Sequence, residues 1–143
     1  MAHTYKNSKA DLTSTSDTVL YTVPSSTVSI VKSILVSNDD ASNACEITVT
    51  LLNTSDTVFS LFKQKDISAK TTTELLSNPL VMNTDEELKV QAENANDLHV
   101  VVSYLEITWR YQYLYLKKIF NKSFQWLKIP LIKHLSIQEI ILL

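Results

Sequence analysis

The feature that most constrains this chain is a series of short segments, spread over residues 18–107, in which apolar side chains occupy every second position. In a β-strand, successive side chains point to opposite faces, so each segment acquires one apolar and one polar face. Several such strands at short intervals predict an all-β, antiparallel β-sandwich of about seven or eight strands. Jelly-roll and immunoglobulin-like sandwiches both fit this number, and the sequence alone does not decide between them.

Polar turn residues and prolines separate the predicted strands. We expect strands at residues 18–23, 27–37, 46–52, 57–62, 71–76, 80–82, 86–92 and 98–107. In the second strand, the side chains expected to face inward are those of Val28, Ile30, Ile34 and Val36. Lys32 interrupts this set and is expected to extend its amine to solvent at a sheet edge. Residues 63–66 are charged and are expected to form a loop, and the last strand is so apolar that a central place in a sheet is expected.

Glycine is absent from all 143 residues, whereas a chain of this length usually contains roughly ten. The turns must therefore use Asn and Asp, which tolerate left-handed backbone angles and hydrogen-bond to their own backbone. Candidate turns of this kind lie at residues 37–40, 53–56, 83–85 and 93–97. The lack of glycine also excludes the P-loop, the dinucleotide-binding fingerprint and the nucleophile elbow.

Charge is divided unevenly along the chain. Residues 1–107 hold seven Lys against fourteen Asp and Glu, a net charge of −7, whereas residues 108–143 hold six Lys and Arg against one Glu, a net charge of +5. Nucleic acid is not an expected partner of the acidic part, because phosphate binding requires clustered basic side chains. We expect three parts: an N-terminal arm at residues 1–17 that is loose unless a partner holds it, the sandwich at residues 18–107, and a C-terminal extension at residues 108–143.

The C-terminal extension is basic and aromatic, and it is predicted to be helical. Apolar residues recur in it at helical spacing, namely Leu116, Ile119, Phe120, Phe124 and Leu127. Three alternatives stay open: it packs on the sandwich or a neighbouring subunit, it lies on a membrane surface, or it is an abnormal, frame-shifted end. No apolar stretch reaches the roughly twenty residues that span a bilayer, so a transmembrane helix is not expected.

The N-terminus and the single cysteine bear on where the protein is made. Residues 1–6 lack the apolar core of a signal peptide, which predicts synthesis in the cytoplasm. Cys45 is the only cysteine, so no disulfide can form within the chain. We expect Cys45 to be a small, half-buried apolar residue, because no base lies near it in sequence to activate its thiol.

The residues that could carry chemistry do not assemble into a motif. His3, His99 and His134 are far apart and lack metal-binding spacing, and His99 is expected at the surface. The acidic residues 85–87 are expected to form a solvated turn, and residues 39–43 are a slightly better but still weak candidate for a calcium loop. We therefore predict no catalytic, cofactor-binding or metal-binding residues, and the protein is not expected to be an enzyme.

Several stretches resemble segments of small β-sandwich virion proteins of marine tailed bacteriophages. Residues 21–27 (YTVPSST) and 30–38 (IVKSILVSN) are similar to two consecutive strands of that family. Residues 59–63 (FSLFK), 88–100 (LKVQAENANDLHV) and 103–107 (SYLEI) look like its later strands. The similarity covers residues 5–107. It departs at residues 39–43, where relatives usually have glycine, and after residue 107, where relatives tend to end.

The resemblance implies a non-enzymatic structural protein of a tailed bacteriophage virion. Such a protein binds the capsid shell or neighbouring subunits as a decoration protein or as a neck or tail component. It works in repeated copies, so the resemblance also implies a homo-oligomer, with a trimer as the expected form. The protein would be made in the host cytoplasm and would end in the virion.

A carbohydrate-binding sandwich for host recognition is the alternative function. Sugar sites favour exposed aromatic rings, because flat rings cover the apolar faces of sugars. The candidate rings are Tyr21, Tyr104 and Trp109. A third possibility is a peripheral membrane protein that acts through residues 111–128, although a membrane is the less expected partner.

Overall fold

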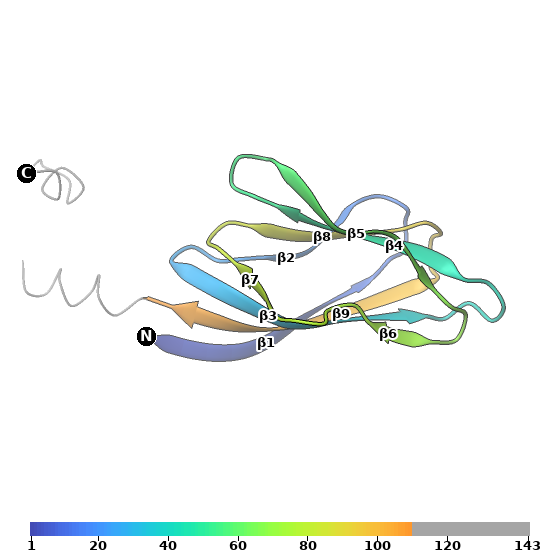
Figure 1. The fold of residues 1–143 in the computed structure, drawn as a ribbon, viewed down its shortest axis with the longest axis horizontal. Coiled ribbons are helices and arrows are strands. Elements are labelled where there is room, and N and C mark those ends of the chain that lie inside the picture. Colours follow the sequence, from blue (N-terminus) through green and yellow to red (C-terminus); the bar gives the residue numbers. More distant parts are fainter. Residues whose placement is uncertain (110–143) are drawn as a thin grey trace, which may run out of the picture. The chain divides into compact units, whose positions relative to one another are not determined.

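Residues 1–109 are described by the computed structural model of this protein, and they contain nine strands and no helix (Figure 1). The strands are β1 (Ala2–Asp11), β2 (Thr18–Thr22), β3 (Thr27–Asn38), β4 (Cys45–Leu52), β5 (Val58–Ile67), β6 (Thr72–Glu74), β7 (Leu80–Met82), β8 (Glu87–Ala92) and β9 (Leu98–Thr108). The helix predicted in the C-terminal extension lies outside the described residues. Within residues 1–109, no helix is long and apolar enough to cross a membrane.

The nine strands form two antiparallel sheets that face each other (Figure 1). One, here called the β9 sheet, has the order β1-β9-β3, and β3 pairs on its far side with both β6 and β7. The other, the β8 sheet, has the order β2-β8-β4-β5. Consecutive strands alternate between the sheets, except for β4 to β5 and β6 to β7. The predicted antiparallel β-sandwich is thus confirmed, and its strand order is that of a jelly roll.

The core lies between the two sheets and is built from alternate residues of the strands. In β9, Leu98, Val100 and Val102 are fully buried, whereas the residues between them are only partly covered. Leu88 and Val90 of β8 contribute to the same core from the opposite sheet. Each buried side chain of this size stabilises the fold by roughly 2 kcal/mol. As its apolar sequence predicted, β9 is central in its sheet, between β1 and β3.

The expected loose arm at residues 1–17 is wrong for most of its length. Residues Ala2–Asp11 form β1, which pairs antiparallel with β9 over ten consecutive residues. The prediction failed because it looked for apolar side chains, and β1 has almost none. What holds β1 is the main chain of β9, whose N–H and C=O groups on that side need hydrogen-bond partners.

The inward-facing set predicted for the second strand is wrong in its first half. Ser29 and Val31 face the core and are fully buried, while Val28 and Ile30 lie on the outer face of the sheet. The reason is a β-bulge: Val31 and Ser33 oppose consecutive residues of β9, so Lys32 between them is an extra residue. An extra residue reverses which face the later side chains occupy. Ile34 and Val36 therefore face inward, as predicted.

The charged loop predicted at residues 63–66 is part of strand β5 instead. The strand runs from Val58 to Ile67, and its pairing with β4 shifts register twice. Gln64 within it has a left-handed backbone, with φ of 51°. β5 is an edge strand, and the charged side chains of residues 63–66 remain exposed to water there.

A carboxylate completes the interrupted edge of the β9 sheet. β7 covers β3 from Ser29 to Val31 and β6 covers it from Leu35 to Ser37, which leaves a gap at residues 32–34. Glu74 fills this gap: its Oε1 accepts the backbone N–H of Ile34 at 2.8 Å, and its other oxygen accepts the hydroxyl of Ser33. Partial burial opposes ionisation of Glu74, but these hydrogen bonds prevail and lower its pKa below the usual 4.5.

Replacing Glu74 tests this role. The Glu74 carboxylate accepts from three donors, the backbone N–H groups of Ile34 and Leu76 and the hydroxyl of Ser33. Glu74→Gln replaces one of its oxygens with an NH₂ group, itself a donor, so we expect a loss of about 1 kcal/mol of unfolding free energy at neutral pH. Because the folded-state pKa of Glu74 is lowered, its contribution is present above pH 4.5 and disappears as the pH falls through the folded value. Urea unfolding at several pH values measures this. Glu87→Gln, which removes only a partly exposed ion pair with Lys89, is the control and should cost less.

Six of the described residues have left-handed backbone angles although none is glycine. Asp56, Asp85 and Asn96 lie in predicted Asn/Asp turns, which confirms that these residue types replace glycine there. Ser26, Gln64 and Lys70 were not predicted, and residues with such side chains are less tolerant of this conformation. The chain therefore carries local backbone strain at several turns.

Lys70→Gly is expected to stabilise the protein. Lys70 is exposed and has φ of 57°, a conformation that glycine adopts without steric cost. We expect a gain of about 0.5–1 kcal/mol in unfolding free energy, measured by urea or thermal denaturation. Lys70→Ala is the matched control, because alanine shortens the side chain but keeps the Cβ that causes the strain. An equal gain from both variants would contradict this explanation.

Candidate functional site

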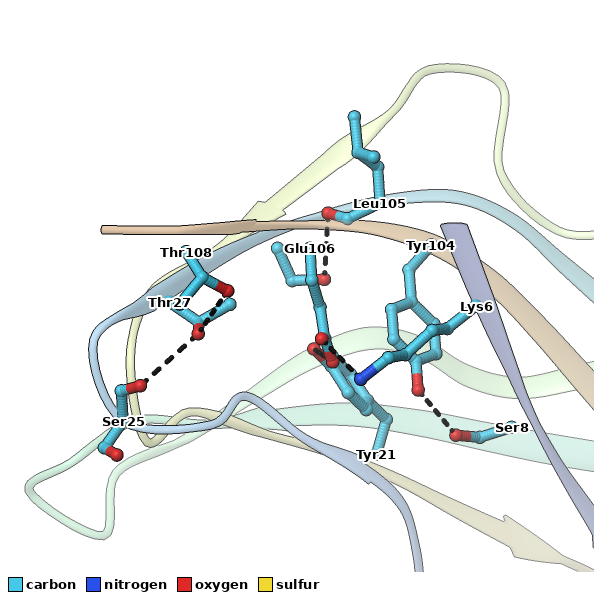
Figure 2. Close-up of polar contacts among 10 residues, drawn as sticks. Lys6, Ser8, Tyr21, Ser25, Thr27, Tyr104, Leu105, Glu106 and Thr108 are labelled. Atoms are coloured by element: carbon cyan, nitrogen blue, oxygen red, sulfur yellow. Dashed lines mark hydrogen bonds and ion pairs between the residues drawn. The ribbon is translucent and has the colours of Figure 1, made fainter. Parts of the chain in front are cut away.

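A buried polar cluster joins the two sheets near the C-terminal end of β9 (Figure 2). At its centre is Glu106, which is only 6% exposed. The hydroxyl of Tyr21 in β2 donates to Oε1 of Glu106 at 3.1 Å. The Nζ of Lys6 in β1 lies 2.7 Å from Oε2 of the same carboxylate. Three strands are therefore connected through one side chain.

Tyr104 extends this cluster along β9. Its ring stacks on that of Tyr21, with centroids 3.9 Å apart and the planes inclined by 30°. Its hydroxyl is 3.0 Å from the hydroxyl of Ser8, and Figure 2 shows that this contact points away from Glu106 toward β1. Both hydroxyls thus have partners, as buried tyrosines require.

The electrostatics of the cluster favour a structural role. Burial raises the pKa of Tyr21 far above its usual value, and the nearby Glu106 carboxylate raises it further. The hydrogen bond to Glu106 raises the pKa of Lys6. Tyr21 therefore keeps its proton and Lys6 its charge at neutral pH. Because one oxygen of Glu106 accepts from Tyr21 and the other pairs with Lys6, the cluster connects the two sheets.

Tyr21→Phe should destabilise the protein more than Tyr104→Phe. The first change leaves an oxygen of a buried carboxylate without its donor, which costs about 2 kcal/mol, while the second removes a bond between neutral hydroxyls worth about 0.5–1 kcal/mol. Both keep an aromatic ring in the stack, so each controls for the other. Urea denaturation monitored by circular dichroism measures the difference. Equal losses would show that Glu106 does not depend on Tyr21.

The predicted surface histidine lies at the opposite end of β9. His99 is 44% exposed; its Nε2 is 3.1 Å from a carboxylate oxygen of Asp39, and its Nδ1 is 3.8 Å from one of Asp11. Among the described residues, no three His, Cys, Asp or Glu side chains are placed to hold a metal ion.

The weak calcium candidate at residues 39–43 is a hydrogen-bonded turn. One oxygen of Asp40 accepts the backbone N–H groups of Ser42 and Asn43, both at 2.7 Å. These bonds lower the pKa of Asp40 and occupy its Oδ1. Cys45, at the end of this turn, is fully buried, so the expectation of a half-buried residue is corrected to complete burial.

The aromatic rings proposed for sugar binding are mostly inaccessible. Tyr21 and Tyr104 are 6% and 5% exposed and stack on each other in the core, so neither can serve as a platform. Trp109 is exposed. A depression on the outer face of the β8 sheet has polar walls, among them Thr48, Gln64 and Gln91, and its lining includes no aromatic ring.

The outer face of the β9 sheet carries a line of apolar side chains that we call the apolar row. Tyr5 of β1 opposes Leu105 of β9, Leu105 opposes Ile30 of β3, and Ile30 opposes Val81 of β7. Tyr5 is 74% and Val81 56% exposed. The Nζ of Lys32 lies 5.9 Å from the ring centre of Tyr5. The row crosses the entire sheet and faces solvent.

The apolar row was missed from sequence for two reasons. Tyr5 was assigned to a loose arm, and Ile30 was expected to face the core. The sequence of the last strand did contain one indication. Leu105 lies between Tyr104 and Glu106, and neighbouring residues of a strand point to opposite faces, so Leu105 must face outward if Tyr104 is buried. Because register decides which residues share a face, the row becomes visible only when the strands are paired.

No protein-family model and no curated protein matches this chain. Its fold is similar to a chain of an infectious bursal disease virus particle, with a TM-score of 0.46 and 12% identity over 73% of this chain and 30% of that chain. It is also similar to a mutant VP2 protein of infectious bursal disease virus, with a TM-score of 0.42 and 10% identity over 73% of this chain and 31% of that one.

A third similar structure is that of the Gt strain of infectious bursal disease virus, with a TM-score of 0.37 and 11% identity over 76% of this chain and 31% of the other. This chain therefore spans about a third of the length of the chains it resembles. At these TM-scores and identities, the likeness carries no argument about function. The strand order by itself defines the class, a jelly-roll β-sandwich protein.

Proposed function

We propose that this protein is a non-enzymatic structural component of a virion, made in the host cytoplasm and incorporated into the particle. In this proposal the virion is that of a tailed bacteriophage, and the protein binds the capsid shell or neighbouring subunits as a decoration protein or a neck or tail component. The observation that carries the proposal is the apolar row on the outer face of the β9 sheet.

The chemistry of the apolar row suits contact with another protein. Contiguous exposed apolar groups on a folded domain mark interaction surfaces, and aromatic residues are enriched in them. Tyr5 and Val81 lie at the two ends of the row, with the partly covered Leu105 and Ile30 between them. A sheet face with this composition fits a complementary protein surface better than a small, polar ligand.

The polar groups that do converge support a structural role. The carboxylates of Glu106, Glu74 and Asp40 each accept two or more contacts from the protein itself. They connect sheets, fill the gap in an edge and shape a turn. Catalysis needs an acid, base or nucleophile free to meet a substrate, and these groups are committed elsewhere.

The resemblance to phage virion proteins supports the choice of particle. The similar stretches fall on β2 and β3, the first half of β5, and β8 and β9, so they come from both sheets. They include Tyr21, Tyr104 and Glu106, which form the buried polar cluster. The likeness therefore involves residues that hold the sandwich together. The carbohydrate-binding alternative is not favoured, because two of its three rings are buried.

The proposal is tested on purified particles from the phage that encodes this chain. Mass spectrometry should detect the protein at many copies per virion, and electron microscopy should show it bound at regular positions. Particles banded twice in a density gradient, compared with a lysate fraction of equal protein content, provide the control for contamination. Intact virions without the protein would overturn the proposal.

A substitution in the apolar row should lower incorporation. Val81→Lys places a charge on the row and is expected to reduce the number of copies per particle about ten-fold, which corresponds to about 1.4 kcal/mol. Val58→Lys is the matched control, because Val58 is similarly exposed, at 60% against 56%, but lies on β5 of the other sheet. Quantitative mass spectrometry of particles measures both. Equal incorporation of the two variants would show that the row is not the binding surface.

A further inference from the structure

The sheet edges of this fold differ in how well they are protected. Within residues 1–109, the edge strands are β1 and the interrupted pair β6 and β7 in the β9 sheet, and β2 and β5 in the β8 sheet. β6 and β7 have three residues each. β2 has five residues and a register shift, and β5 has two shifts and several charged residues. Short, bulged or charged edges resist pairing with another chain.

β1 lacks these protections. It pairs with β9 over ten residues without a register shift and contains no proline. Its residues from Ala2 to Asn7 are all exposed, and its free edge runs along the margin of the sheet (Figure 1). A long, regular edge presents a row of backbone N–H and C=O groups that can receive another strand.

The charged side chains of β1 do not block this edge. Lys6 lies on the core-facing side of β1, where its half-exposed side chain is held by Glu106, with Nζ 2.7 Å from Oε2, and so is directed away from an incoming strand. Lys9 and Asp11 both lie on the outer face, near the strand's C-terminal end. His3, which carries a positive charge when protonated, lies near the N-terminal end of the strand. Opposite charges thus sit at positions that an antiparallel copy of β1 would bring together.

We propose that β1 pairs antiparallel with β1 of a second copy of this protein, about a two-fold axis at Asn7. The β9 sheet then continues from one copy into the other. This inference rests on the proposed self-association and names its surface; it gives a pair of copies in place of the trimer expected from the resemblance. The occupant of the edge is a second copy because the side chains of β1 are complementary to themselves.

The complementarity is clearest on the outer face. With Asn7 opposite Asn7 of the second copy, Asp11 opposes His3 of the second copy, and Lys9 opposes Tyr5 of the second copy. The first pair has opposite charges when the histidine is protonated, and the second places an ammonium group beside an aromatic ring. The two-fold axis repeats both pairs, so four favourable contacts flank the centre.

The registers adjacent to this one are less favourable. Shifting the axis to Lys6 places this lysine opposite Lys6 of the second copy and Lys9 opposite His3. Shifting it to Ser8 leaves Ala2, His3 and Thr4 beyond the end of the opposing strand. A shift by a single residue between the two strands would place outer-face side chains of one copy opposite core-facing ones of the other. The register centred on Asn7 is therefore the one that the sequence of β1 favours.

Cysteine cross-linking of the whole 143-residue chain tests both the contact and its register. Opposing Cα atoms in an antiparallel pair lie roughly 5 Å apart, within the range of a disulfide. Asn7→Cys should therefore form a cross-linked dimer when oxidised glutathione accepts the two electrons released by its two thiols. In the control, Lys9→Cys, the two thiols lie four residues apart along the strands, about 13 Å, and should not join. Cys45 is fully buried and does not interfere.

Non-reducing gel electrophoresis reads the result. A dimer band that is at least ten-fold stronger for Asn7→Cys than for Lys9→Cys supports the inference. Equal bands for the two variants would overturn the register, and no band for either would overturn the contact. Neither of these results would contradict the proposal that the protein is a virion component, which fails only if purified particles lack the protein.

A second measurement probes the same contact without a covalent bond. Tyr5→Lys places two like charges opposite each other, and we expect the dimer dissociation constant measured by sedimentation to rise about ten-fold. Adding Lys9→Glu restores an attractive pair and should bring the dissociation constant back toward the original value. A wild-type protein that sediments as a monomer, or a double variant as weak as the single one, would overturn the inference.

Discussion

The structure depends on the pairing of β9 on both of its sides. Its backbone is bonded to β1 along ten residues and to β3 along eleven, while alternate side chains fill the space between the sheets. This central strand therefore supplies main-chain partners for a strand with almost no apolar side chains and anchors the buried Glu106. Without β9, β1 would lose its backbone hydrogen-bond partner, and the polar cluster would lose Glu106 at its centre. Both the fold and the candidate surface follow from this one ladder.

The predictability of the fold follows the strength of the period-two signal. Strands such as β4, β8 and β9 have regular alternation, and their bounds agree with the sequence to within a residue or so. β1 was missed because main-chain hydrogen bonds hold it in place, and these do not require a strand to have alternating apolar and polar side chains. The set of β3 residues predicted to face inward was half wrong because the extra residue Lys32 reverses the alternation of inward and outward side chains. No local sequence feature indicates such a bulge. The jelly-roll order could not be predicted because it is a property of contacts distant in sequence.

The candidate site was harder to predict than the fold. Tyr21 and Tyr104 were expected to be available to a ligand, yet their parity with buried neighbours such as Val23 and Val102 places both in the core. A glutamate at position 106 has the same parity as these residues, which in retrospect indicates a buried charge in need of partners. Its partner Lys6 lies on a strand that sequence reasoning did not recognise. The apolar row likewise requires four strands in register, and the only one of its members to which the sequence assigned a face, Ile30, was expected to face the core.

The interrupted margin formed by β6 and β7 has a consequence for assembly. A sheet that could grow at both margins would add copies without limit and form a fibre. Here the far margin is broken into two short pieces with the Glu74 carboxylate in the gap between them, so it cannot receive a strand. In the proposed dimer, β1 of each copy pairs with β1 of the other, so neither β9 sheet keeps a long, regular margin that could receive a third copy. The product of this pairing would be a closed pair of defined size instead of a polymer.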